Sequence, residues 1–172
     1  MLERVRRTGA RPLLFALLFG VVAQTATAGA ALLGRPAPDF VLKDLAGDNV
    51  RLSEYRGRVV LLAFYARWAG DSRLEMPALG RIDTTYRRAG VSVLGVSVDA
   101  DTGRAAEFAR AMHVDYPLLL DGGARIGRAY DLRKIPLTIL IDRSGIVRYV
   151  KAGYRRGDDH AFVAEIRTLL SE

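Results

Sequence analysis

One stretch of the chain, residues 59–77, restricts its possible folds more than any other. Val59 to Phe64 is a continuous apolar run with β-branched residues at its start, which favours a central strand buried on both faces. A short polar turn follows, and the pattern Ser72-x-x-Glu75 predicts a helix whose N-cap is Ser72, stabilising it by about 1 kcal/mol. A buried strand that leads through a turn into a helix favours an α/β fold. The helix stripe expected to face inward consists of Leu74, Ala78, Ile82 and Tyr86.

Apolar runs and amphipathic segments alternate through the rest of the chain and predict a mixed sheet flanked by helices. Residues 59–64 and 91–98 are expected to be parallel, because a helix lies between them. The turn at residues 142–145 predicts an antiparallel hairpin. The expected strands are 40–43, 49–52, 59–64, 91–98, 116–120, 137–141 and 146–150, and the expected helices are 53–57, 72–90, 102–112, 123–130 and 158–170.

The first 28 residues have the three parts of a secretory signal peptide: a basic start, an apolar run at 13–23, and small residues at 26–28. The apolar run is shorter than the roughly 20 residues that span a bilayer. This favours cleavage after residue 28, or after Ala30, over retention as a membrane anchor. The mature chain is then exported without a stable membrane anchor, into the periplasm if the source is Gram-negative. The expected folded domain covers residues 34–172.

The composition excludes several kinds of chemistry. The chain has no cysteine, which rules out disulfides, thiolate metal sites, thiol mechanisms and lipoprotein anchoring. Two histidines make a poor metal set, and residues 99–103 fit helix capping by Asp101 or Thr102 better than a calcium loop, so no metal or cofactor is expected. The net charge is +7, of which residues 1–28 hold +3 and the rest +4. These charges are scattered, so no nucleic-acid partner is expected.

Six segments in a family-like order carry a resemblance to a known group. They are residues 34–40, 52–62, 64–77, 96–99, 115–121 and 135–145. The sequence resembles exported thioredoxin-like proteins of the TlpA/ResA type, within the broader redoxin (AhpC/TSA) group, over about residues 34–170. The resemblance implies a thioredoxin-like fold with a mixed central sheet and an N-terminal strand pair.

The resemblance also locates the family's active site. Where the family has Trp-Cys-x-x-Cys-Arg, this chain has Trp68-Ala69-Gly70-Asp71-Ser72-Arg73. Ala69 stands at the attacking position and Ser72 at the resolving one, and neither can exchange with a disulfide. Thioredoxin itself has a buried acid at the position of Ala63, so that proton acceptor is expected to be missing as well. By ancestry the chain is a thiol-disulfide oxidoreductase, but it is expected to be redox-inactive.

The leading hypothesis is therefore protein or peptide binding in the cell envelope. The resemblance implies that Pro136 is cis and faces the 69–72 turn, where an extended segment can pair in strand-like fashion. Trp68 is expected to be partly exposed beside it, as a binding anchor. The alternative is that Pro136 is only a bend and Trp68 only covers the core. The expected groove residues are Trp68, Ala69, Gly70, Asp71, Ser72, Ile135 and Pro136.

Two other functions stay open. One is a structural subunit of an envelope complex. The other is an enzyme that uses non-thiol residues close to Ser72, which requires a positioned base with a perturbed pKa. The histidines, His113 and His160, are expected at the surface, away from Ser72. The residues available to such an enzyme are Asp71, Ser72, Arg73 and Glu75.

Overall fold

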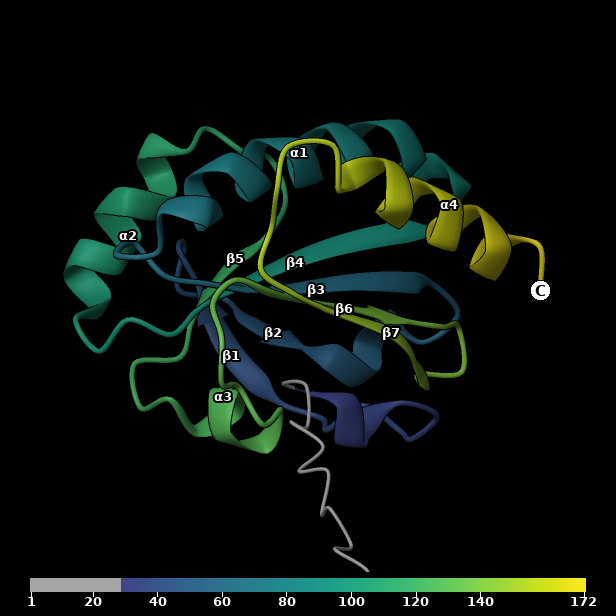
Figure 1. Cartoon of the computed structure of the whole chain (residues 1–172). Helices are drawn as coiled ribbons and strands as arrows, with labels where there is room; N and C mark the ends of the chain where they lie inside the picture. The colour runs from purple at the N-terminus through teal and green to yellow at the C-terminus, as the bar shows by residue number, and fades with distance from the viewer. Residues whose placement is uncertain (1–28) are drawn as a thin grey trace, which may run out of the picture.

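A seven-stranded mixed sheet forms the centre of the computed structural model, which describes residues 29–172 (Figure 1). Its strand order is β2-β1-β5-β4-β3-β6-β7. The strands are β1 (Val41–Asp44), β2 (Asn49–Arg51), β3 (Val59–Tyr65), β4 (Val91–Ser97), β5 (Leu118–Leu120), β6 (Leu137–Ile141) and β7 (Val147–Ala152). The α-helices are α1 (Gly70–Tyr86), α2 (Thr102–Ala111), α3 (Arg125–Ala129) and α4 (Asp159–Leu170), and single 3-10 turns are η1 (Ala30–Leu32), η2 (Leu52–Tyr55) and η3 (Arg87–Ala89).

The expected signal peptide, residues 1–28, lies outside the described residues. Within residues 29–172, no helix is both long enough and apolar enough to cross a bilayer.

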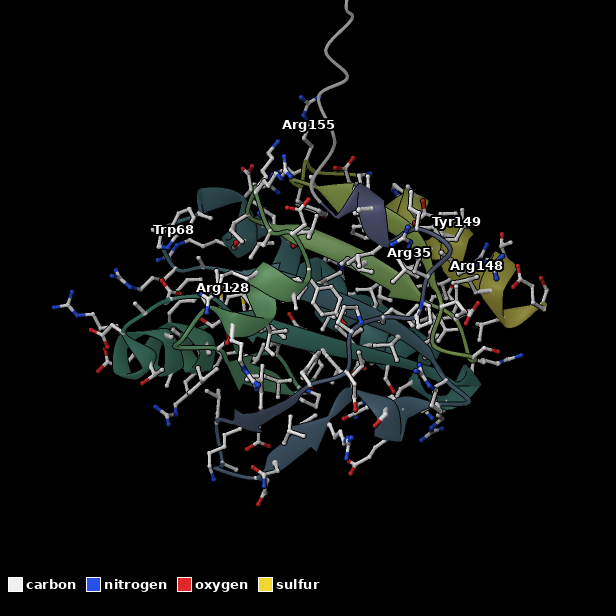
Figure 2. All side chains as sticks on the ribbon, turned by 90° about the horizontal axis from the view of Figure 1, so that it is seen from below. Arg35, Trp68, Arg128, Arg148, Tyr149 and Arg155 are labelled. Atoms are coloured by element: carbon white, nitrogen blue, oxygen red, sulfur yellow. The ribbon has the colours of Figure 1, made fainter. Side chains whose placement is uncertain are left out.

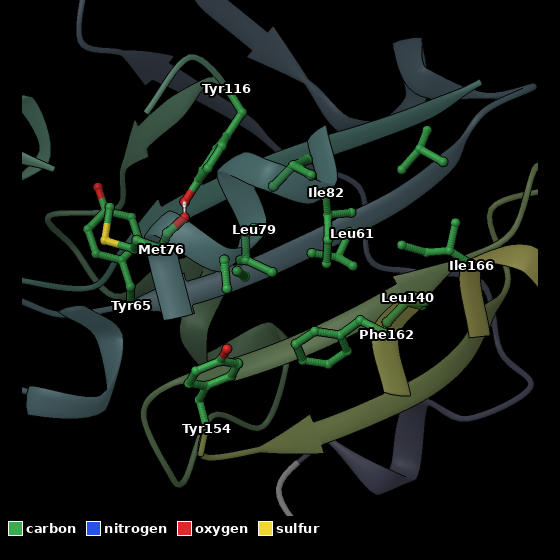
Figure 3. Close-up of a cluster of buried hydrophobic side chains, with 14 of the residues drawn as sticks. Leu61, Tyr65, Met76, Leu79, Ile82, Tyr116, Leu140, Tyr154, Phe162 and Ile166 are labelled. Carbon is green, nitrogen blue, oxygen red and sulfur yellow. Dashed lines mark hydrogen bonds between the residues drawn. The ribbon is translucent and has the colours of Figure 1, made fainter. Parts of the chain in front are cut away.

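Strand β3 is the innermost element, and all seven of its residues are buried. It pairs in parallel with β4 and antiparallel with β6, with Val59 opposite Val91 and Val60 opposite Ile141. Because successive side chains point to opposite faces, β3 contributes to two cores. Its odd-numbered residues pack under α1, α2 and α4 (Figure 3), and its even-numbered residues pack on the side that carries α3. The thioredoxin-like α/β fold, with a strand pair β1–β2 at one edge, is confirmed.

The core beneath α1 includes two tyrosines whose hydroxyl groups differ in their contacts. Tyr116 donates a hydrogen bond to the carbonyl of Met76 at 3.2 Å, which ties the loop before β5 to the middle of α1 (Figure 3). The hydroxyl of Tyr65 is buried without a partner among the described residues.

Most expected element bounds agree with the structure to within two residues, but the start of α1 differs. The helix begins at Gly70 with Ala69 as N-cap, and no side chain caps it. The predicted capping box is therefore wrong: Ser72 lies within the first turn, and Glu75 points into the core.

The predicted stripe of α1 is also partly wrong. Ala78 and Ile82 are buried, whereas Leu74 is 39% exposed and Tyr86 is half-buried. The stripe is partly wrong because the side of α1 that faces the sheet also holds polar residues, whereas the hydrophobic pattern places polar side chains on the outer side. The buried residues of α1 are Ser72, Glu75, Met76, Ala78, Leu79, Ile82 and Asp83.

Gly95 in β4 leaves room for three large side chains to pack directly against the sheet. A Cβ atom at Gly95 would lie 2.6 Å from Cδ2 of Leu118 and 3.2 Å from ring atoms of Tyr65 and Tyr116.

We expect Gly95→Ala to lower the free energy of unfolding by about 1–3 kcal/mol through overpacking, measured by urea denaturation. The control is Gly70→Ala, where a Cβ meets open space at a helix start, and this change should shift stability by less than about 1 kcal/mol. Equal stability of the two variants would contradict the packing seen at Gly95.

Candidate functional site

The candidate site is the turn between β3 and α1, residues 66–69, which emerges where the central strand ends. Trp68 is 65% exposed at the tip of this turn, whereas its neighbour Ala69 is buried. The amide of Ala69 donates to the carbonyl of Ala66 at 3.1 Å, and the amide of Ser72 donates to the carbonyl of Ala69 at 3.0 Å. The turn is thus compact and raises only its central residues into solvent.

A buried aspartate after β4 fixes the turn from below. Asp99 is 4% exposed, and its Oδ2 accepts from the amide of Arg67 at 3.0 Å and from Oγ of Ser97 at 3.1 Å. The guanidinium of Arg67 adds an ion pair, with Nε 3.6 Å from Oδ1. Asp99 therefore has no part in a calcium loop, and the predicted capping of α2 is made by Asp101, which accepts from the amide of Arg104 at 3.0 Å. Among the described residues, no group of three or more possible ligands could hold a metal ion.

Ser72, at the position of the resolving cysteine, is completely buried. The one hydrogen bond that its hydroxyl makes with the described residues is accepted from the amide of Ala66 at 3.4 Å. His113 follows the end of α2 and His160 lies in the first turn of α4, and both are exposed as expected. A completely buried hydroxyl that no histidine contacts among residues 29–172 is not placed to attack a substrate.

Glu75 is a buried carboxyl near the turn whose pKa is strongly shifted. It is 1% exposed, its Oε1 accepts from Oγ1 of Thr138 at 2.6 Å, and its Oε2 has no partner among residues 29–172. Burial raises its pKa to about 7, against a lowering by the Thr138 hydrogen bond. In the sheet, Thr138 is directly opposite Ala63. The strand position of thioredoxin's buried acid is Ala63 in this chain and carries no acid, but α1 places the buried carboxyl of Glu75 on the adjacent strand, at Thr138.

The segment before β6 lies beside the turn. The Ile135–Pro136 peptide bond is cis, Pro136 is buried, and its carbonyl accepts from the amide of Gly153 at 2.7 Å. Among the described residues, no backbone hydrogen bond is made by residues 133–135. These amide and carbonyl groups are free to pair with an extended segment.

A hollow of about 490 Å³ joins the turn to this segment. Trp68 and Ile135, both expected groove residues, line it. Ala69, Ser72 and Pro136 are buried, and Gly70 and Asp71 are exposed without lining it. The hollow's other lining residues lie directly after β4, at the start of and within α3, and in the loop after α3: Val98, Ala124, Gly127, Arg128, Leu132, Arg133 and Lys134.

Sequence reasoning missed the basic side of this hollow. Figure 2 shows Trp68 and Arg128 projecting at the same end of the molecule, although 60 positions separate them in the chain. Trp68 and Arg128 line the same hollow because of how α3 packs on the sheet, and no local sequence pattern predicts that packing. The sequence did contain one indication of a basic groove, since Arg133 and Lys134 directly precede the Ile135-Pro136 pair.

The fold, together with a turn that has Ala69 and Ser72 at the two cysteine positions of the family, defines the class of protein, a redoxin. Residues 33–150 match the family model "AhpC/TSA family". The chain belongs to the AhpC/TSA family, and its ancestry is that of the thiol-disulfide oxidoreductases.

Individual relatives agree. The chain is 35% identical over 130 residues to thiol-disulfide oxidoreductase ResA of Geobacillus kaustophilus, covering 76% of this chain and 75% of that protein. Among solved structures, it is similar to a putative thiol:disulfide interchange protein DsbE from Chlorobium tepidum, with a TM-score of 0.77, 33% identity, and coverage of 80% and 97%. A putative protein disulfide isomerase from Bacteroides thetaiotaomicron has a TM-score of 0.75, 35% identity, and coverage of 81% and 91%.

The buried carboxyl of Glu75 predicts a dependence of stability on pH. Because folding raises its pKa from 4.5 to about 7, the folded state holds its proton more tightly than the unfolded state. The stability that this group contributes is complete below pH 4.5 and is lost as the pH rises through 7, by about 3 kcal/mol in all. Glu75→Gln should remove this slope and be more stable than the wild type at about pH 8, measured by urea unfolding across pH.

The matched control is Glu54→Gln in the exposed turn η2, which should keep the wild-type slope. A wild-type profile that is flat between about pH 5 and 8 would contradict the raised pKa.

Proposed function

We propose that this protein is an exported, redox-inactive member of its family that acts by binding an extended segment of another protein at the Trp68 hollow. The observation that carries the proposal is an exposed tryptophan beside an open hollow and unpaired backbone, on a turn that has no thiol. The name "binding hollow" is used below for the cavity lined by Trp68, Ile135 and their neighbours.

The loss of redox activity follows from chemistry. Disulfide exchange needs a thiolate that attacks and a thiol that resolves the mixed disulfide. Ala69 carries no nucleophile, Ser72 is buried, and no other cysteine exists in the chain to replace them.

We expect no reduction of insulin disulfides by the purified protein with dithiothreitol above the rate of dithiothreitol alone, measured by turbidity. The positive control is the double variant Ala69→Cys and Ser72→Cys, which restores both sulfurs on a turn of the family's geometry and should give clear turnover. Turnover by the wild-type chain would overturn the proposed inactivity.

The binding hollow supports recognition of a polypeptide in two ways. A large exposed aromatic side chain beside half-buried apolar residues is a usual binding anchor, and Trp68 is the most exposed large apolar side chain among residues 29–172. The free amide and carbonyl groups of residues 133–135 suit strand-like pairing, which recognises backbone without regard to sequence.

Export is supported by the expected signal peptide and by one relative. A solved structure that is 25% identical, with a TM-score of 0.65, is described as a pneumococcal exposed lipoprotein thioredoxin from Streptococcus pneumoniae. This chain has no cysteine to carry a lipid, so we propose a free protein of the cell envelope, periplasmic in a Gram-negative source.

The other two functions have less support. An enzyme built on Ser72 would have a base of raised pKa in Glu75, but both side chains are fully buried and no hydrogen bond joins them. A structural subunit without groove function would not require an exposed Trp68.

Peptide display tests the binding role. Random peptides selected on the wild-type protein should lose about tenfold or more in affinity for Trp68→Ala, because the anchor is removed. The matched control is Leu33→Ala, another exposed apolar residue at 48% exposure, which should leave affinity unchanged. Failure to select any peptide, or equal binding by Trp68→Ala, would overturn the proposal and favour a structural role.

A further inference from the structure

The binding hollow has charge of one sign. Three basic side chains line it, Arg128, Arg133 and Lys134, and among residues 29–172 no acidic residue does. The remaining lining residues are apolar or small, so basic residues and apolar side chains such as Leu132 and Ile135 line the same hollow. An apolar floor with a cationic rim favours a ligand that is both apolar and anionic.

Two of the three charges have no ion-pair partner in the described part of the chain. Arg133 pairs with Asp131, with Nε 2.9 Å from Oδ1. Within residues 29–172, neither Arg128 nor Lys134 forms an ion pair. Two other arginines near the turn do have acidic partners, Arg67 with Asp99 and Arg104 with Asp101, whereas the guanidinium of Arg73 lies over the ring of Phe108.

The helix that carries Arg128 is held rigidly. Three successive amides at the start of α3, those of residues 125–127, donate to the carboxylate of Asp121 at 3.1, 2.9 and 3.0 Å. At its other end, Tyr130 packs on Phe64 with ring centroids 5.0 Å apart, and its hydroxyl donates to the carbonyl of Pro38 at 2.7 Å. The guanidinium of Arg128 therefore projects from a fixed base, which lowers the entropy lost when it binds a ligand.

We propose that the binding hollow takes an acidic peptide segment: an extended chain with an apolar side chain against Trp68 and carboxylates beside Arg128 and Lys134. This inference rests on the proposed function and adds the chemical class of the partner. Arginine binds a carboxylate through two parallel N–H donors, and lysine adds a point charge. A small free anion would leave the apolar floor and the free backbone of residues 133–135 unused.

The test compares three fluorescein-labelled synthetic peptides by anisotropy, each with a central leucine. The acidic probe carries Asp and Glu around the leucine, the neutral probe carries Asn and Gln at the same positions, and the basic probe carries Lys. We expect the acidic probe to bind about tenfold tighter than the neutral one at about 50 mM salt, and this ratio to fall as salt rises. Trp68 is the only tryptophan, so its fluorescence should change on binding and places the contact.

A double variant, Arg128→Gln with Lys134→Gln, should reduce the acidic preference to about threefold or less while leaving the neutral probe unaffected. The control double variant is Arg88→Gln with Arg110→Gln, two exposed arginines that do not line the hollow. It should keep the full preference, which separates a local effect from a change in net charge.

The outcomes distinguish the two proposals. If acidic and neutral probes bind equally and Trp68→Ala abolishes both, groove binding stands and the acidic preference is overturned. If no probe binds and display also selects nothing, both proposals fail.

Vesicles containing phosphatidylglycerol, and inorganic phosphate as a competitor, form two further arms of the experiment. Binding of either one through Arg128 and Lys134, without binding of the acidic probe, would overturn the assignment to a peptide.

Discussion

Strand β3 is paired along both edges and covered on both faces, and this double constraint positions everything at the candidate site. A strand so enclosed cannot shift register without moving its apolar side chains to the wrong face. Because Phe64 is opposite Leu137, the residue before Leu137, Pro136, must come beside the point where β3 ends. The turn with Trp68 and the segment with Ile135 are therefore brought together by sheet register, without any direct bond between them.

Two buried carboxyl groups near the turn show how differently burial can act. Asp99 has three donors around it, and it fixes the backbone of the turn. Glu75 has one donor and an oxygen without a partner among the described residues, so its charged form is disfavoured. The first stabilises the surface on which Trp68 projects. The second makes α1 more stable on the sheet in acid than in alkali, in a chain with no thiol left for that carboxyl to serve.

Apolar patterning was sufficient to predict an α/β fold with a mixed sheet, because β3, β4 and β6 are continuous buried runs, and the resemblance to a family added the thioredoxin-like topology. It failed at the start of α1, where Ser72 and Glu75 have polar side chains that sequence patterns assign to the outside. Their inward position depends on Thr138 and on the amide of Ala66, partners that are distant or lie across the turn. The basic side of the hollow was missed for the same reason, since Arg128 reaches Trp68 only through the packing of α3.

The absence of sulfur changes how a partner can be held. A dithiol turn can hold its partner through a mixed disulfide, so its groove needs little affinity of its own. In the proposed role every contact is non-covalent, and the apolar contacts come from only a few side chains, among them Trp68, Leu132 and Ile135. In the proposed binding role, charge on the rim contributes in two ways: it raises the association rate and it rejects segments of the wrong sign. In the proposed role, a surface with Trp68 for contact and with Arg128 and Lys134, which form no ion pair within residues 29–172, for selection suits brief, salt-sensitive binding, and a partner is released by dissociation instead of by thiol exchange.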